Sequence, residues 1–284
     1  MNKPKYEFDR LVDRTGSGSL KDAYMPQAVR DAGLVSYWGA EFDFPTCPAF
    51  SEGVRACAER GLYAFTLQTG AYNERVVWWQ KQMRGWDIEP GWIVPTHGTI
   101  FALATAIRLF VGEGQNLVTI HPGYRRYEQA ASRQGRGCAV SQMRCENGRY
   151  ALDFADLEEK LSCPENALLV VCNPNNPTGA VLSEAELRRI DAFSRQYQVP
   201  VFCDEIFAEV TLNGATISPY GKIAGADSLA ITCTSLGKCM SLTGVNHANV
   251  LIPNPELRER YTRQKYADHY CLCAQCACLR AGDQ

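Results

Sequence analysis

The sequence predicts an α/β fold built around a mostly parallel sheet, and two observations indicate this fold. From about residue 90, short apolar runs alternate with segments whose apolar residues recur at helical spacing. Strands that alternate with helices in this way form βαβ units, which build parallel sheets. In addition, unusual polar motifs directly follow several of the apolar runs. Parallel sheets bind ligands beyond the carboxyl ends of their strands, so we expect these motifs to meet at one edge.

The expected elements follow one another in a regular order. An apolar run in 91–98 (GWIVPTHG) ends at a glycine, and 99–110 (TIFALATAIRLF) has helical periodicity. A serine followed three residues later by glutamate predicts a capping box where a later helix begins. The remaining expected elements are a strand in 116–124, a helix in 127–134, a strand in 167–173, a helix in 183–197, and strands in 199–207 and 228–235.

The composition excludes several classes of protein. The 284-residue chain is 46% hydrophobic and 21% charged, as expected of a globular protein. Its 29 basic and 31 acidic residues nearly balance, whereas a nucleic-acid-binding surface requires a basic surplus. The first ten residues lack the apolar core of a signal peptide, and no apolar run approaches the length of a membrane span. We therefore expect a cytoplasmic protein with neither a nucleic-acid partner nor a membrane partner.

The 13 cysteines are consistent with a reducing compartment. Several lie inside apolar runs, where a free cysteine acts as a small buried hydrophobe. The pair Cys273 and Cys276 has a spacing that could ligate zinc, but a structural zinc site needs a second ligand pair. The flanking residues favour a helix instead, so we predict no metal site.

Two of the strand-end motifs are suited to a phosphorylated heterocycle. In the stretch PTHGTI, the backbone N–H groups of Gly98, Thr99 and Ile100 would point away from a starting helix and could bind a phosphate. In HPGYRRY, Tyr124 could present its ring to a bound heterocycle, although a half-buried loop tyrosine explains it equally well.

Two further motifs place an amide and a carboxylate at strand ends. The long string NPNNPTG contains two Asn-Pro steps, which restrict the backbone and would hold Asn176 where its amide can donate to an anionic oxygen. Asp204 follows a buried run, where a charge needs a partner. A protonated pyridine nitrogen would be one such partner, while a helix cap or a salt bridge is the alternative.

The stretch TSLGKCMSLTG adds a lysine, Lys238, after the last expected strand. Most lysines are solvated surface residues. An amine at this place can, however, form a Schiff base with an aldehyde, and Ser235 could help to hold a phosphate. An aspartate that keeps a pyridine ring protonated makes that ring an electron sink. Together with the other motifs, these residues predict a site for pyridoxal 5′-phosphate (PLP) with Lys238 as the catalytic residue.

On these motifs the chain resembles fold-type-I PLP enzymes of the class I/II aminotransferase group. More narrowly it resembles the cystathionine β-lyase (C–S lyase, MalY/PatB) branch. The narrower resemblance is carried by FDRLVDRTGSGSLK near the start, WGAEFDF at 38–44, ENGRYALDFADLEEKL at 146–161 and LTGVNHANVLIPNPELRER after the lysine. It implies the three-layer, aspartate aminotransferase-like fold around the mostly parallel sheet.

The resemblance also implies a function in amino-acid metabolism. It implies a homodimer that cleaves cystathionine or another cysteine S-conjugate by α,β-elimination to a thiol, pyruvate and ammonia. Lys238 would then serve as the general base at the substrate α-carbon. Gly39 and neighbouring backbone, together with Asn176, would position the substrate carboxylate. A PLP-dependent aminotransferase on the same fold is one alternative, and a non-catalytic or regulatory homologue is another.

Several positions depart from the family pattern. Phe207 stands where aminotransferases have tyrosine and this branch often has histidine, and Phe65 stands where the partner subunit usually offers a tyrosine to the phosphate. Gly237 precedes the lysine where serine is frequent. Each change would remove about one hydrogen bond, or roughly 0.5–3 kcal/mol. Asn246 stands where aminotransferases carry a phosphate-binding arginine and the lyase branch often has glutamine, which favours the lyase branch.

The resemblance suggests a division of the chain into three parts. We expect an N-terminal arm and small-domain segment at 1–45, a large PLP-binding domain at 46–265, and the start of a truncated C-terminal small domain at 266–284. Relatives in the family continue for roughly a hundred residues beyond the position of Gln284, as the resemblance implies.

Overall fold

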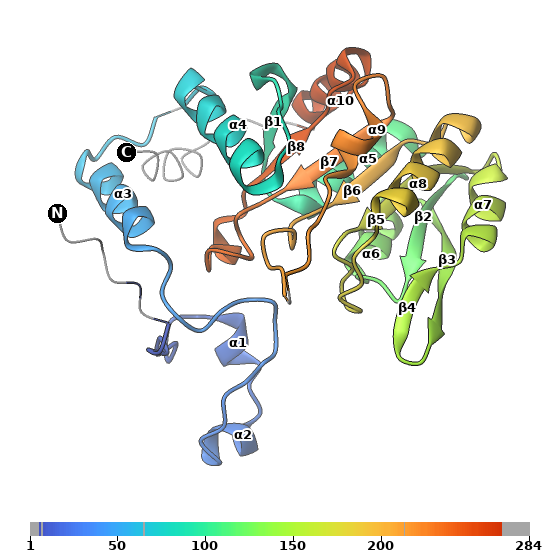
Figure 1. Cartoon of the computed structure of the whole chain (residues 1–284). Helices are drawn as coiled ribbons and strands as arrows, with labels where there is room; N and C mark the ends of the chain where they lie inside the picture. The colour runs from blue at the N-terminus through green and yellow to red at the C-terminus, as the bar shows by residue number, and fades with distance from the viewer. Residues whose placement is uncertain (1–5, 7, 65, 213, 269–284) are drawn as a thin grey trace.

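The computed structural model describes residues 6, 8–64, 66–212 and 214–268. Within these residues, an eight-stranded sheet forms the centre of the molecule, with the strand order β1-β8-β7-β6-β5-β2-β3-β4 (Figure 1). The strands are β1 Ile93–Thr96, β2 Asn116–His121, β3 Gly137–Glu146, β4 Arg149–Leu152, β5 Asn166–Cys172, β6 Val201–Asp204, β7 Ala230–Thr234 and β8 Ala248–Leu251.

Most strands of this sheet run in one direction. The neighbouring pairs β2–β3, β2–β5, β5–β6 and β6–β7 are parallel. β8 is antiparallel to both β7 and β1, and β4 is antiparallel to β3. Because two successive antiparallel pairings restore the original direction, β1 points the same way as β7. The carboxyl ends of β1, β2, β5, β6 and β7 therefore lie at one edge, and the mostly parallel sheet is confirmed.

Helices cover both faces of the sheet and give three layers (Figure 1). One core cluster packs α5, α6 and α10 on one face, and a second packs α7, α8 and α9 on the other. Strand β5 shows why both faces are apolar: Leu168 and Val170 point into the first cluster, and Leu169 and Val171 into the second. The helices of the two faces are α5 Thr99–Phe110, α6 Arg126–Ser132, α10 Pro255–Ala267, α7 Phe154–Ser162, α8 Glu184–Tyr197 and α9 Tyr220–Ala224.

Side chains at the helix ends explain where these helices begin. The predicted capping box is confirmed at α8, where Ser183 and Glu186 each bond the other's backbone N–H group. The carboxylate of Asp153 accepts hydrogen bonds from two backbone N–H groups in the first turn of α7. Helix α4, Gly70–Arg84, begins at a Thr69 cap and ends at Gly85, which has the left-handed conformation (φ +58°) that favours glycine.

The N-terminal part of the chain forms an arm that extends away from the sheet (Figure 1). It contains the short helices α1, Leu20–Ala23, and α2, Gln27–Asp31, and leads into α3, Pro48–Glu59. The boundaries that we expect near residues 45 and 265 stay predictions. None of the described helices combines the length and the apolar character needed to cross a lipid bilayer.

A buried ion pair joins α4 to the sheet. Arg84 donates from Nη2 to Oε2 of Glu205, and the two side chains are 2% and 0% exposed. The second oxygen of Glu205 accepts a hydrogen bond from the backbone N–H of Tyr220 at the start of α9 (2.7 Å). Glu205 directly follows β6, so this carboxylate holds two helices against a strand end.

We predict that Arg84→Met lowers the free energy of unfolding by about 3–5 kcal/mol, because it leaves the Glu205 charge buried without its partner. Urea denaturation at pH 7 measures this loss. Arg144→Met is the control, since Arg144 is 59% exposed in its pair with Asp153 and should contribute much less. Equal losses in the two variants would contradict the prediction.

Candidate cofactor site at the carboxyl ends of the strands

Lys238 is half-buried in the loop that follows β7. Its Nζ atom donates a hydrogen bond to the backbone oxygen of Ala40 (3.1 Å) and lies 5.7 Å from the centroid of the Phe207 ring. Burial lowers the pKa of the Lys238 amine, although the carboxylates of Asp204 and Glu41 oppose this shift. A lower pKa leaves more of the amine unprotonated at neutral pH, which makes it a better nucleophile.

Asp204 is the last residue of β6 and is 2% exposed. Its Oδ2 accepts a hydrogen bond from the hydroxyl of Tyr127 (2.6 Å), and its Oδ1 accepts one from the backbone N–H of Ile206 (3.2 Å). Burial nevertheless raises the pKa of Asp204 to about 6, because these hydrogen bonds and the charge of Lys238 do not offset desolvation. A cationic ligand group at this carboxylate would therefore stabilise its ionised form.

The sequence motifs indicate Tyr124 but not Tyr127, which lies three residues later in the first turn of α6. The two rings meet edge to face with centroids 5.4 Å apart. Tyr127 is 5% exposed and contacts Asp204 directly, whereas Tyr124 is 36% exposed and free to meet a ligand. Tyr124 precedes α6 and Tyr127 lies in its first turn, so the YRRY motif alone does not show which ring contacts Asp204.

The predicted glycine turn lies between β1 and α5. Gly98 is the N-cap of α5 and has a φ of +87°, a conformation that strains other residues. A β-carbon there would also lie 3.7 Å from the backbone carbon of Asn246, so the turn runs close to the loop before β8. The N–H groups of a first helical turn lack acceptors within their own helix, so those of Thr99 and Ile100 can serve an anion.

Ser235 connects the lysine loop to the start of β8. Its hydroxyl donates to the backbone oxygen of His247 (2.6 Å) and accepts the N–H of Gly237 (3.0 Å). To donate to a phosphate, the Ser235 hydroxyl has to rotate away from His247.

The loop after β5, which carries Asn176, begins beside Asp204. Cys172, the last residue of β5, lies opposite Asp204 in the register of β5 and β6. The N–H of Asn173 donates to the Asp204 backbone oxygen (2.9 Å). Asn175 fixes the turn, because its Oδ1 accepts both the N–H and the hydroxyl of Thr178 (3.2 and 2.7 Å). Sequence reasoning attributed this rigidity to the prolines and overlooked the Asn175 side chain.

The arm reaches this edge of the sheet from the other end of the chain. Gly39 has a φ of +82° and directly precedes Ala40, whose backbone oxygen contacts Lys238. The structure thus brings Gly39, Lys238 and Asp204 into one region.

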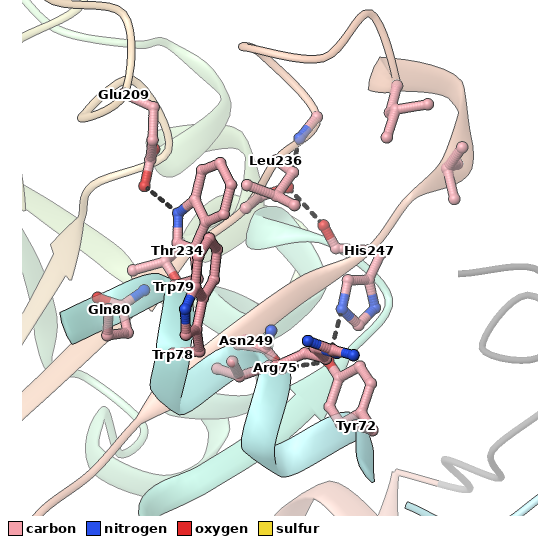
Figure 2. A pocket seen from close by; sticks show the side chains of 15 residues that line it. Tyr72, Arg75, Trp78, Trp79, Gln80, Glu209, Thr234, Leu236, His247 and Asn249 are labelled. Atoms are coloured by element: carbon pink, nitrogen blue, oxygen red, sulfur yellow. Dashed lines mark hydrogen bonds between the residues drawn. The ribbon is translucent and has the colours of Figure 1, made fainter. Parts of the chain in front are cut away.

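A cavity of about 460 Å³ borders the lysine loop (Figure 2). Of the predicted site residues, it is lined by Ser235. Trp79 on its wall donates to Glu209 (3.2 Å), as Figure 2 shows. The other lining residues are Tyr72, Arg75, Val76, Trp78, Gln80, Thr234, Leu236, Gly237, Leu242, Val245, His247 and Asn249.

Two interpretations from the sequence concern residues that the structure does not describe. Phe65 is one of them, and the cysteines at 271–278 are the others. Among the described residues, no group of three or more histidine, cysteine, aspartate or glutamate side chains could hold a metal ion.

Residues 53–281 match the family model of aminotransferase class I and II. The chain belongs to this family. Among curated members, it is 27% identical over 257 residues to cystathionine β-lyase PatB of Bacillus subtilis, and 22% identical over 257 residues to protein MalY of Escherichia coli. These alignments cover 90% of this chain, but 66% and 65% of the two relatives. This family member thus spans just under two thirds of the length of these curated proteins.

Solved structures agree with this family assignment. Cystalysin from Treponema denticola, which contains a PLP cofactor, superposes with a TM-score of 0.89 at 26% identity, covering 99% of this chain and 73% of cystalysin. The PLP-bound C–S lyase from Staphylococcus hominis has a TM-score of 0.87 at 22% identity, covering 99% of this chain and 71% of the lyase, and shows the same fold. The aspartate aminotransferase-like fold is confirmed for this family member.

We predict that Asp204→Asn stabilises the cofactor-free chain at pH 7.5. The pKa of Asp204 rises from an ordinary 3.8 to about 6 on folding, so the ionised carboxylate destabilises the fold above pH 6. Removing the charge should raise the free energy of unfolding by up to about 3 kcal/mol. The native state binds the extra proton between pH 6 and 4, so the gain should disappear by pH 4.

Urea denaturation at pH 7.5, 6 and 4 measures this gain. Asp227→Asn, at an 83% exposed carboxylate, is the control and should change stability little. A gain that persists unchanged at pH 4 would rule out the charge as its cause.

Proposed function

We propose that this chain binds PLP and acts, in the intact protein, as a C–S β-lyase on cystathionine or another cysteine S-conjugate. The observation that carries the proposal is the placement of a half-buried amine and a buried carboxylate after neighbouring strands. Lys238, with a lowered pKa, and Asp204, with a raised one, interact electrostatically. A desolvated amine and a carboxylate without a full cationic partner are the groups that an aldehyde and a protonated pyridine nitrogen require.

The surrounding residues fit the rest of the cofactor. The first turn of α5, at Gly98, Thr99 and Ile100, would bind the phosphate, with Ser235 at its side. Tyr124 would cover the ring, and Asn176 would donate to the ring oxygen. Bound PLP supplies an electron sink for the substrate carbanion.

The chain's own residues would then perform three tasks. Lys238 would hold the cofactor through Nζ and, once displaced by the substrate amine, would take the proton from the substrate α-carbon. Asp204 would stay ionised and keep the ring nitrogen protonated, with Tyr127 fixing its orientation. The backbone at Gly39 and the amide of Asn176 would orient the substrate carboxylate, after which the thiolate leaves the β-carbon.

Two observations favour elimination over amino transfer: the names of the curated relatives and the residue at position 246. The first curated relatives are cystathionine β-lyases, although a putative aminotransferase of Bacillus subtilis is also 27% identical over 215 residues. Asn246 lies beside the phosphate turn in a left-handed conformation (φ +51°) and carries no charge. A non-catalytic role would be favoured by Phe207, which cannot hydrogen-bond to the cofactor. The homodimer and a cytoplasmic location stay predictions.

Addition of PLP to the purified chain should produce a visible absorption band, and borohydride reduction should fix the cofactor to Lys238. Peptide mapping by mass spectrometry identifies the labelled residue. Lys238→Ala is the negative control, and Lys222→Ala, at a lysine on the α9 helix, should label like the unmodified chain. Label on another lysine, or no band at all, would refute PLP binding at this site.

Incubation of the PLP-loaded protein with cystathionine should release pyruvate, ammonia and a thiol in equal amounts. Lactate dehydrogenase reports the pyruvate, and a thiol reagent reports the thiol. Lys238→Ala should lower the rate at least about a hundredfold, because it removes the general base. Amino transfer to an added keto acid without thiol release would identify an aminotransferase instead.

A further inference from the structure

The last segment of the arm is bound directly to the lysine loop. Besides the Lys238–Ala40 contact, Ser241 donates to the backbone oxygen of Phe44 (3.2 Å) and Thr46 donates to that of Met240 (2.6 Å). Three hydrogen bonds thus hold residues 40–46 against residues 238–241. Glu41 lies within this docked segment.

The Glu41 carboxylate faces the region of Lys238. A β-carbon built on Gly39 would lie 3.9 Å from Oε1 of Glu41, so the side chain folds back over Gly39. Its negative charge acts on the Lys238 amine. The Glu41 side chain is 28% exposed and therefore accessible to a small ligand.

Arg14 holds Glu41 in this position. Its Nη1 lies 3.1 Å from Oε1 of Glu41, and its Nη2 donates to the backbone oxygen of Phe42 (2.6 Å) and lies 3.3 Å from Asp43. Lys21, 4% exposed, pairs with the other oxygen of Asp43 (2.5 Å). One guanidinium group therefore fixes both the backbone and the acidic side chains of the docked segment.

We propose that Glu41 binds the ammonium group of an α-amino acid beside Lys238, and that Arg14 is the positioning residue that orients it. The inference rests on the proposed function. When Lys238 holds a cofactor through Nζ, Glu41 loses the charge of that amine and keeps Arg14 as its cationic neighbour. An incoming amino-acid ammonium replaces that charge, whereas a carboxylic acid without an amine does not. Glu41 thereby selects free α-amino acids, and Arg14 keeps its carboxylate at the entrance.

Binding of two small probes to the PLP-loaded chain tests this role without turnover of a lyase substrate. L-Alanine carries the ammonium group but no β-leaving group, and propionate is its counterpart without the amine. Isothermal titration calorimetry should show that Glu41→Gln weakens L-alanine binding about tenfold and leaves propionate binding unchanged. Arg14→Gln should have the same effect, and Arg14→Lys should retain part of the affinity, because lysine cannot contact Glu41 and Phe42 together.

Arg30→Gln is the matched control, because Arg30 forms an ion pair with Asp22 in the same arm (2.6 Å) and takes no part in the docked segment. It should bind both probes like the unmodified chain. A normal cofactor band together with unchanged L-alanine affinity in Glu41→Gln would overturn the inference alone. Absence of the band in the unmodified chain would overturn the proposed function and this inference with it.

Discussion

The site depends on a constraint of direction: β1, β5, β6 and β7 all end at the same edge of the sheet. Each strand is short and buried, and its hydrogen bonds to neighbouring strands fix where it ends. The polar residues that follow the strands are therefore held close to one another. The antiparallel strand β8 is part of this constraint, because it lies between β1 and β7 and leaves their directions equal. The loop that leads into β8 also places Asn246 against Gly98, the N-cap of α5.

At this edge of the sheet, the buried carboxylate of Asp204 has no full cationic partner among the described residues. Burial raises the pKa of Asp204 to about 6, so its protonated form is favoured below that pH, and burial also disfavours the charged form of Lys238. Next to them, the Arg84–Glu205 pair satisfies a second buried carboxylate with a guanidinium and a backbone N–H. Both oxygens of Glu205 thus have partners, whereas the adjacent Asp204 lacks a full positive charge beside it. A buried carboxylate in this condition is typical of a ligand-binding site.

The sequence was sufficient for the features that depend on local pattern. Apolar runs and helical periodicity predicted β1, β2, β5, β6 and β7 together with α5, α6 and α8, and the capping box predicted the start of α8. They did not predict β8, which has four residues, or the β3–β4 hairpin, whose strands are mostly exposed and form no continuous apolar run. Polar motifs at strand ends identified Lys238 and Asp204, since each directly follows an apolar run.

Local sequence patterns could not predict the residues that support the site. Tyr127 contacts Asp204 from 77 positions away, and Arg84 contacts Glu205 from 121 positions away. Neither pairing leaves a signal in a single sequence, because an ordinary tyrosine or arginine on a helix looks the same whether its partner is a buried acid or water. Phe207 was read as a lost hydrogen bond, whereas the structure places its ring near the lysine amine.

The contact between Ala40 and Lys238 joins residues 198 positions apart, which has a consequence for how the protein is made. The arm leaves the ribosome before its docking loop, which is synthesised roughly 10–40 s later at ordinary translation rates. During this interval residues 40–46 have no lysine loop to bind. Residues 40–46 are thus synthesised well before the loop that holds them in place.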